Sequence, residues 1–160
     1  MAYGLKYRNN FEGINDLTNV KYNVLLEIFQ DGYAGAVTEI EEMDKNPLQF
    51  RLDNSGDTHY VPIKKTSVSI NIVDTGQFDY SEFYTSNAKM YKVVITSPVL
   101  NWQGYLVPQS CNSNLNYRQP FTLTASDGLH LLSSIDYVPD QSKTVSLSTF
   151  IADIESKIGL

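Results

Sequence analysis

The residues best suited to proton transfer near neutral pH are the two histidines of the chain. His59 lies in a polar stretch, and His130 follows Asp127 by three residues. An aspartate with a histidine provides half of a general acid–base site, but no motif places a nucleophile beside this pair. We therefore favour a structural role, in which Asp127 is the helix cap of a short helix and accepts hydrogen bonds from its first backbone N–H groups.

No other reactive group of the chain has a catalytic partner beside it in the sequence. Cys111 is the single cysteine, so it can form no intrachain disulfide, and no neighbouring histidine or basic residue activates it. The acidic cluster within Glu39–Asp44 crowds one stretch, whereas glycoside hydrolysis needs two carboxylates held across a cleft. The loop Asp53–Asp57 lacks the closing glutamate of a calcium site. We expect a protein that is not an enzyme, with no catalytic residue, no metal and no cofactor.

Length and charge limit the classes of function further. The 160 residues suit one domain with a core, and the net charge of -6 opposes binding to nucleic acid or to an anionic membrane surface. The N-terminus lacks the apolar segment of a signal peptide, and no apolar run approaches the length of a membrane span. We expect a protein that is made in the cytoplasm and binds neither nucleic acid nor membrane.

The elements that would position these groups are mostly strands. Alternating apolar and polar residues predict strands over 20–30, 48–53, 67–72, 91–96, 100–107 and 121–126. Residues 1–18 alternate too weakly to predict more than coil with a short edge strand. The turn signal Asp31-Gly32 predicts a hairpin whose return strand lies within 33–43.

Two shorter features qualify this pattern. Gly104 interrupts a predicted strand and indicates a bulge or a close approach of another backbone. The aromatic segment Phe78–Tyr84 predicts one or two helical turns that plug one end of a barrel or cover a sheet. The expected fold class is mainly β: an antiparallel β-barrel or sandwich with one short helix after the Asp127-Gly128-Leu129 (DGL) motif and a C-terminal amphipathic helix.

We predict that the chain consists of two parts, with the boundary after residue 138. Residues 1–138 form the predicted β-barrel or sandwich domain, and residues 139–160 form a linker and an amphipathic helix. The apolar stripe of that helix needs a cover, so we expect either an oligomer or a further domain of a longer protein to bury it. The members of this candidate interface are Phe150, Ile151, Ile154 and Ile158, together with Leu147.

Aromatic residues in polar surroundings form a second candidate interface. Trp102 and Tyr117 have the rigid, amphipathic side chains that are enriched in protein interfaces. The tyrosines of such loops are equally compatible with simply covering strand ends, and both interpretations stay open here.

The order of the motifs resembles a known family. The pieces are EIFQDGYAG, NPLQFRLDNSGDTHYVPIKKTSVSINIVD, FDYSEFYTSNAKMYKVVI, WQGYLVP and PFTLTASDGLHLL, which together cover about residues 20 to 135. In this order they are similar to the N-terminal domain of tail proteins of the baseplate hub type, encoded by phages and prophages of gut Bacteroidetes. Residues 136–159 are similar to the linker and helix that lead into the next domain of such proteins.

The resemblance implies a structural role in virion assembly. A hub-type β-barrel domain binds tail tube, spike or fibre partners, forms a homo-oligomer that is often a trimeric ring, and has no catalytic residues. The protein would be made in the host cytoplasm and would end in a virion or phage-like tail particle. A hub, a distal tail adaptor and a fibre-attachment module all remain open. The alternative from another class is a carbohydrate-binding β-sandwich module, with Trp102 and Tyr105 in an exposed aromatic platform.

Overall fold

Strands make up nearly all of the regular structure. The computed structural model describes residues 2–15, 18–52, 65–76, 78–108, 120–128 and 152. Within these residues eight strands form one sheet, and a short 3₁₀ helix lies between the fifth and sixth strands. The elements are β1 (Tyr3–Asn15), β2 (Val20–Asp31), β3 (Thr38–Glu39), β4 (Met43–Leu52), β5 (Thr66–Val73), η1 (Tyr80–Phe83), β6 (Tyr91–Thr96), β7 (Asn101–Leu106) and β8 (Pro120–Ser126).

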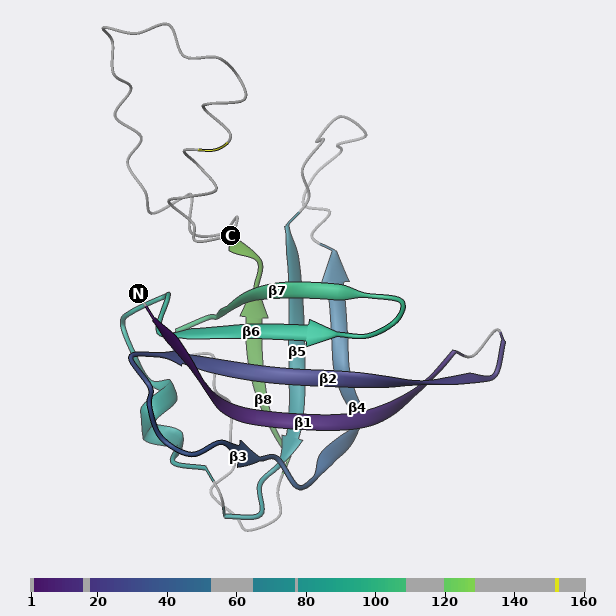
Figure 1. The fold of residues 1–160 in the computed structure, drawn as a ribbon, viewed down its shortest axis with the longest axis horizontal. Coiled ribbons are helices and arrows are strands. Elements are labelled where there is room, and N and C mark those ends of the chain that lie inside the picture. The colour runs from purple at the N-terminus through teal and green to yellow at the C-terminus, as the bar shows by residue number, and fades with distance from the viewer. Residues whose placement is uncertain are drawn as a thin grey trace, which may run out of the picture.

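The sheet folds over on itself to make two layers. Its strand order is β3-β1-β2-β6-β7-β8-β5-β4. β1, β2, β6 and β7 form one layer, and β8, β5 and β4 run crosswise behind them (Figure 1). The fold line lies between β7 and β8, which share only two paired positions in the described part of the chain, Tyr105 with Ser126 and Leu106 with Ala125. All described pairings are antiparallel except that of β1 with β3.

Gly104 allows the sharp fold between β7 and β8. A Cβ atom at this position would lie 2.3 Å from the carbonyl oxygen of Ser126 and 2.5 Å from the indole of Trp102. Any side chain would therefore push the two strands apart, as the prediction of a close backbone approach anticipated.

The core lies between the two layers. Every second residue of the central strands points inward, which is the alternation that the sequence shows. The front layer contributes Leu26, Ile28, Val93 and Ile95, and the rear layer contributes Val68, Ile70, Ile72, Phe121, Leu123 and Ala125, all of them buried.

The connection between β3 and β4 joins the two layers on one side. Its backbone is bonded to both, because Ile40 N–H donates to the carbonyl of Arg8 on β1 and Val73 N–H on β5 donates to the carbonyl of Glu42. Ile40 itself is buried in the core. The sandwich is therefore partly closed into a barrel along this side.

The mainly β prediction is confirmed, and the predicted strands from residue 20 onward correspond to β2, β4, β5, β6, β7 and β8. The helical turns expected in Phe78–Tyr84 correspond to η1. The short helix after the DGL motif, the domain boundary at 138 and the C-terminal helix lie outside the described residues, apart from Gly128 and the exposed, helical Ala152.

Two predictions near the N-terminus are wrong. Residues 3–15 form the 13-residue strand β1, which pairs with β2 throughout; a register shift between Leu5 and Tyr7 hides its alternation in the sequence. The turn at Asp31-Gly32 leads into no hairpin partner, because both edges of β2 are taken by β1 and β6. The segment that follows contains only the two-residue β3 among its described strands, parallel to β1.

Candidate docking groove

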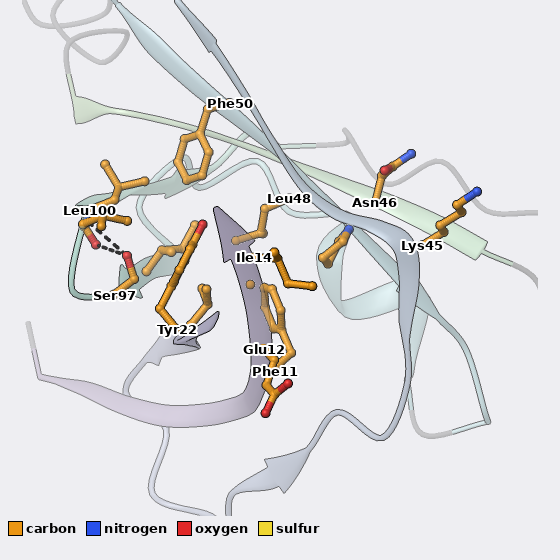
Figure 2. Close-up of a pocket in the computed structure, with 15 residues that line it drawn as sticks. Phe11, Glu12, Ile14, Tyr22, Lys45, Asn46, Leu48, Phe50, Ser97 and Leu100 are labelled. Carbon is orange, nitrogen blue, oxygen red and sulfur yellow. Dashed lines mark hydrogen bonds between the residues drawn. The ribbon is translucent and has the colours of Figure 1, made fainter. Parts of the chain in front are cut away.

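A groove opens between the two layers at the end of the β1–β2 hairpin. Its volume is about 580 Å³, within the range of ligand pockets. Three elements form its walls: the hairpin, β4, and the turn between β6 and β7 (Figure 2). Apolar side chains predominate among the lining residues, and the charged ones are Glu12 and Lys45.

β4 supplies the most unusual wall of the groove. Leu48 and Phe50 are paired with Ile70 and Val68, so their side chains lie on the core-facing side of the rear layer. Ile70 and Val68 are fully buried, yet Phe50 is 44% exposed and Leu52, next on the same side, is 53% exposed. Because the two layers are twisted and cross each other, they diverge at their corners. The front layer therefore no longer covers the end of β4.

The other walls carry further exposed apolar side chains. Ile14 lies at the end of the hairpin and is half exposed, while Tyr22 packs partly against the core below it. On the turn between β6 and β7, Val99 and Leu100 are exposed. Ser97 fixes this turn, because its hydroxyl accepts from Leu100 N–H at 3.0 Å and its backbone N–H donates to the Leu100 carbonyl at 2.8 Å.

A polar network borders the groove next to Phe50. Trp102 packs edge-on against Phe50, with ring centroids 6.2 Å apart, and its indole N–H donates to Thr66 Oγ1 at 2.9 Å. The Thr66 backbone N–H and hydroxyl both donate to one carboxylate oxygen of Asp127, at 2.5 and 2.8 Å. Three strands, β7, β5 and β8, are thus tied together at their ends through Thr66.

The opposite end of the sandwich is closed by η1. Asp79 caps this helix by accepting from Ser81 N–H at 3.0 Å, and Phe78 and Phe83 point into the core. Phe78 lies 4.9 Å from the Tyr7 ring and 5.0 Å from that of Phe121, so it joins the two layers directly. This segment was expected either to plug one end of a barrel or to cover a sheet, and its aromatic contacts with both layers favour the plug.

A charged pair anchors the plug to β1. Lys6 Nζ bonds the Glu82 carboxylate, and the Tyr7 hydroxyl donates to the other oxygen of the same carboxylate. The Lys6 ammonium also lies 5.3 Å from the Tyr33 ring centroid and 5.9 Å from that of Tyr91. This set resembles an aromatic cage, but a lysine of the chain itself already fills it.

The tyrosines of this end are held in their neutral form. Burial, followed by the hydrogen bond to Glu82, raises the pKa of Tyr7 well above its ordinary value. Burial also raises the pKa of Tyr91, and the nearby charges of Glu82 and Asp79 add to the effect. These phenols therefore act as hydrogen-bonding core residues and not as acids or bases near neutral pH.

The candidate reactive side chains form no metal-binding group in the described part of the chain. No group of three or more His, Cys, Asp or Glu residues within it could hold a metal ion, and none of its helices is long and apolar enough to cross a membrane. Of the acidic cluster, Glu39 pairs with Arg8 and Glu41 is exposed. His59, His130 and Cys111 lie outside the described residues.

The predicted site residues have different outcomes. Asp127 bonds Thr66 across the sheet, a contact that the sequence did not suggest, while the helix that it was expected to cap lies outside the described residues. Trp102 is half-buried beside the groove. The remaining candidate interface residues lie outside the described part: Tyr117, Phe150, Ile151, Ile154 and Ile158.

The groove itself was not predicted. Its exposed residues belong to sequence segments whose alternation is typical of an ordinary strand. This alternation predicts which face of a strand is apolar, but not whether a second layer covers that face. One available signal was Val99-Leu100 directly after Pro98, an apolar pair in a turn where polar residues are usual. No family model, no curated protein and no solved structure matches this chain.

Proposed function

We propose that this protein is a structural assembly module of a phage-like tail or baseplate, which binds tube, spike or fibre proteins through the groove. The observation that carries the proposal is Phe50, an aromatic side chain on the core-facing side of β4 that is 44% exposed. Contiguous exposed apolar surface in a folded domain is typical of an interaction site. The choice of a phage-like tail rests on the order of sequence motifs.

The groove has the composition of a protein interface. Three aromatic residues line it, Phe11, Tyr22 and Phe50, and aromatic residues are among the types that contribute most to binding between proteins. Glu12 forms an ion pair with Lys21, which neutralises one of the two charges at the groove. An apolar partner surface therefore meets little electrostatic opposition there.

The carbohydrate alternative gains no support from the aromatic residues on which it depends. Stacking on a sugar needs an open ring face, but Tyr105 is buried and Trp102 is half-buried with its indole N–H bonded to Thr66. Glycan-array binding that is lost in Trp102→Ala, while the unfolding temperature is kept, would favour this alternative over the assembly module.

The assembly proposal is tested by co-expressing the chain with the tail-tube, spike and fibre proteins encoded beside its gene. A complex should co-purify, and Phe50→Lys should abolish it because a charge in the groove opposes apolar contact. The matched control is Tyr84→Lys, since Tyr84 is an aromatic residue that is 56% exposed and lies outside the groove lining. Adjacent genes for polysaccharide use, or no complex with any tail protein, would contradict the proposal.

A further inference from the structure

The groove is bordered by a free sheet edge as well as by apolar side chains. β4 is the last strand in the sheet order, and no described strand pairs with its side away from β5. An edge strand points alternate N–H and C=O groups outward, where they can bond another extended chain. At the opposite end of the sheet, the two-residue β3 pairs with β1 only at Tyr7 and Arg8, so the remainder of β1 also has an edge without a described partner strand.

Only part of this edge is open to pairing. The first half of β4 contains Lys45, Pro47 and a register irregularity between Met43 and Leu48, features that obstruct the addition of a strand. The second half, Leu48–Leu52, contains no proline and keeps a regular register against β5. The segment of five residues next to the groove is therefore the receptive one.

The side chains of this segment match an extended ligand. Leu48, Phe50 and Leu52 lie on the groove side, and Gln49 and Arg51 lie on the other face. A strand paired with β4 places its own alternate residues on the same two faces, so its apolar side chains would cover the exposed surface of Phe50. A docked helix would leave the outward backbone groups of β4 without partners, so the edge favours a strand.

Charge adds a second requirement for the ligand. Arg51 on β4 and Lys65 just before β5 are both exposed and line one small pocket of about 320 Å³. Neither has an ion-pair partner among the described residues. A carboxylate on the outer face of the added strand, next to Arg51, would neutralise this basic pair.

From these observations we infer that the β4 edge at Leu48–Leu52 accepts an extended segment of a partner protein, with apolar residues at alternate positions and an acidic residue opposite Arg51. The inference rests on the proposed assembly function and names the form of the partner at the same groove. Binding adds a ninth strand to the described sheet and covers the groove.

The test is selection of binders from a random library of twelve-residue peptides, with the full chain as bait. We expect enriched peptides with apolar residues at every second position and a carboxylate between them. Phe50→Lys should weaken the best peptide more than about tenfold, Arg51→Gln should weaken it by a smaller factor, and Tyr84→Lys should leave it unchanged.

Amide hydrogen exchange with the selected peptide completes the test. Alternate amides of Leu48–Leu52 should become protected on binding. The inference would be overturned if the selected peptides have apolar residues three and four apart, if no binders are found, or if the protected amides lie elsewhere. Each of these results is compatible with a tail complex that depends on Phe50. A dimer of the free chain that Phe50→Lys dissociates would also overturn it, because the edge would then serve a second copy. If the peptides bind the β4 edge as expected but no tail protein forms a complex with the chain, only the proposed function is contradicted.

Discussion

Phe83 and Phe50 both face the space between the two layers, yet Phe83 is 4% exposed and Phe50 is 44% exposed. Phe83 is held by η1 against Tyr91, with ring centroids 5.3 Å apart, whereas Phe50 meets the edge of Trp102 beside an open groove. The same residue type thus stabilises the fold at one end and remains available at the other. The difference lies in the covering element and not in the strands themselves.

The largest expected effect on stability is the loss of the Phe83 side chain, compared with the same truncation at Phe50. Phe83→Ala should lower the free energy of unfolding by about 3–5 kcal/mol, because a buried aromatic ring is replaced by a cavity. Phe50→Ala should lower it by less than about 1 kcal/mol, since much of the ring is already in water. Denaturant unfolding of both variants measures the contrast, and equal losses would break the comparison.

The next effect concerns the fold line that joins the layers. Gly104→Ala should lower the free energy of unfolding by about 1–3 kcal/mol, because the added Cβ meets the Ser126 backbone. Thermal unfolding measures this change. Gly32→Ala is not a suitable control because Gly32 has a positive φ of 71°, so Ala36→Gly, at an exposed position, serves instead. A neutral Gly104→Ala would mean that the two strands can separate without loss.

A third prediction separates two roles of Asp127. Asp127→Ala should lower the free energy of unfolding by about 1–3 kcal/mol, because the Thr66 N–H loses its acceptor. If the loss acts through Thr66, a cycle with Thr66→Val should show coupling between the two positions. An unchanged melting temperature in Asp127→Ala would remove both the cross-strand bond and the helix cap as stabilising features.

The smallest effect is a dependence on alkaline pH at the closed end. The pKa values of Tyr7 and Tyr91 are raised in the folded chain, so above pH about 10 these phenols ionise first in the unfolded state. The stability that these two phenols contribute should therefore be fully present below that pH and be lost as the pH rises beyond it. Tyr7→Phe should reduce the slope of melting temperature against pH, whereas Tyr22→Phe, at the groove, serves as the control. Equal slopes in all three proteins would contradict the prediction.

The sequence predicted the strands whose alternation is regular and the helical turns that close one end. Val68–Ile72 alternates without interruption because one face of β5 is buried in the core and the other is only partly covered, while both of its edges are paired. Phe78 and Phe83 both enter the core as expected. β1 was missed because the register shift at Leu5/Tyr7 breaks its periodicity. A local turn signal at Asp31-Gly32 could not reveal that β6, sixty residues away along the chain, occupies the edge of β2.

The groove lay beyond prediction for a related reason. Leu48, Phe50 and Leu52 alternate like a buried strand, and only the divergence of two crossing layers leaves the last two of them exposed. Asp127 likewise pairs with Thr66, 61 residues distant in sequence, a contact that no local pattern encodes. Local periodicity determines the face on which a side chain lies, and the tertiary arrangement determines whether that face is covered.

The central claim is that the end of the sandwich at β4 is open, with backbone groups free to bond another strand, while the end at η1 is closed. Residue-resolved amide exchange of the free chain tests it most directly. Alternate amides from Leu48 to Leu52 should exchange rapidly, while those of β5, which pairs with β4 on one side and with β8 on the other, should exchange slowly. Uniformly slow exchange along β4 in the free chain would contradict it.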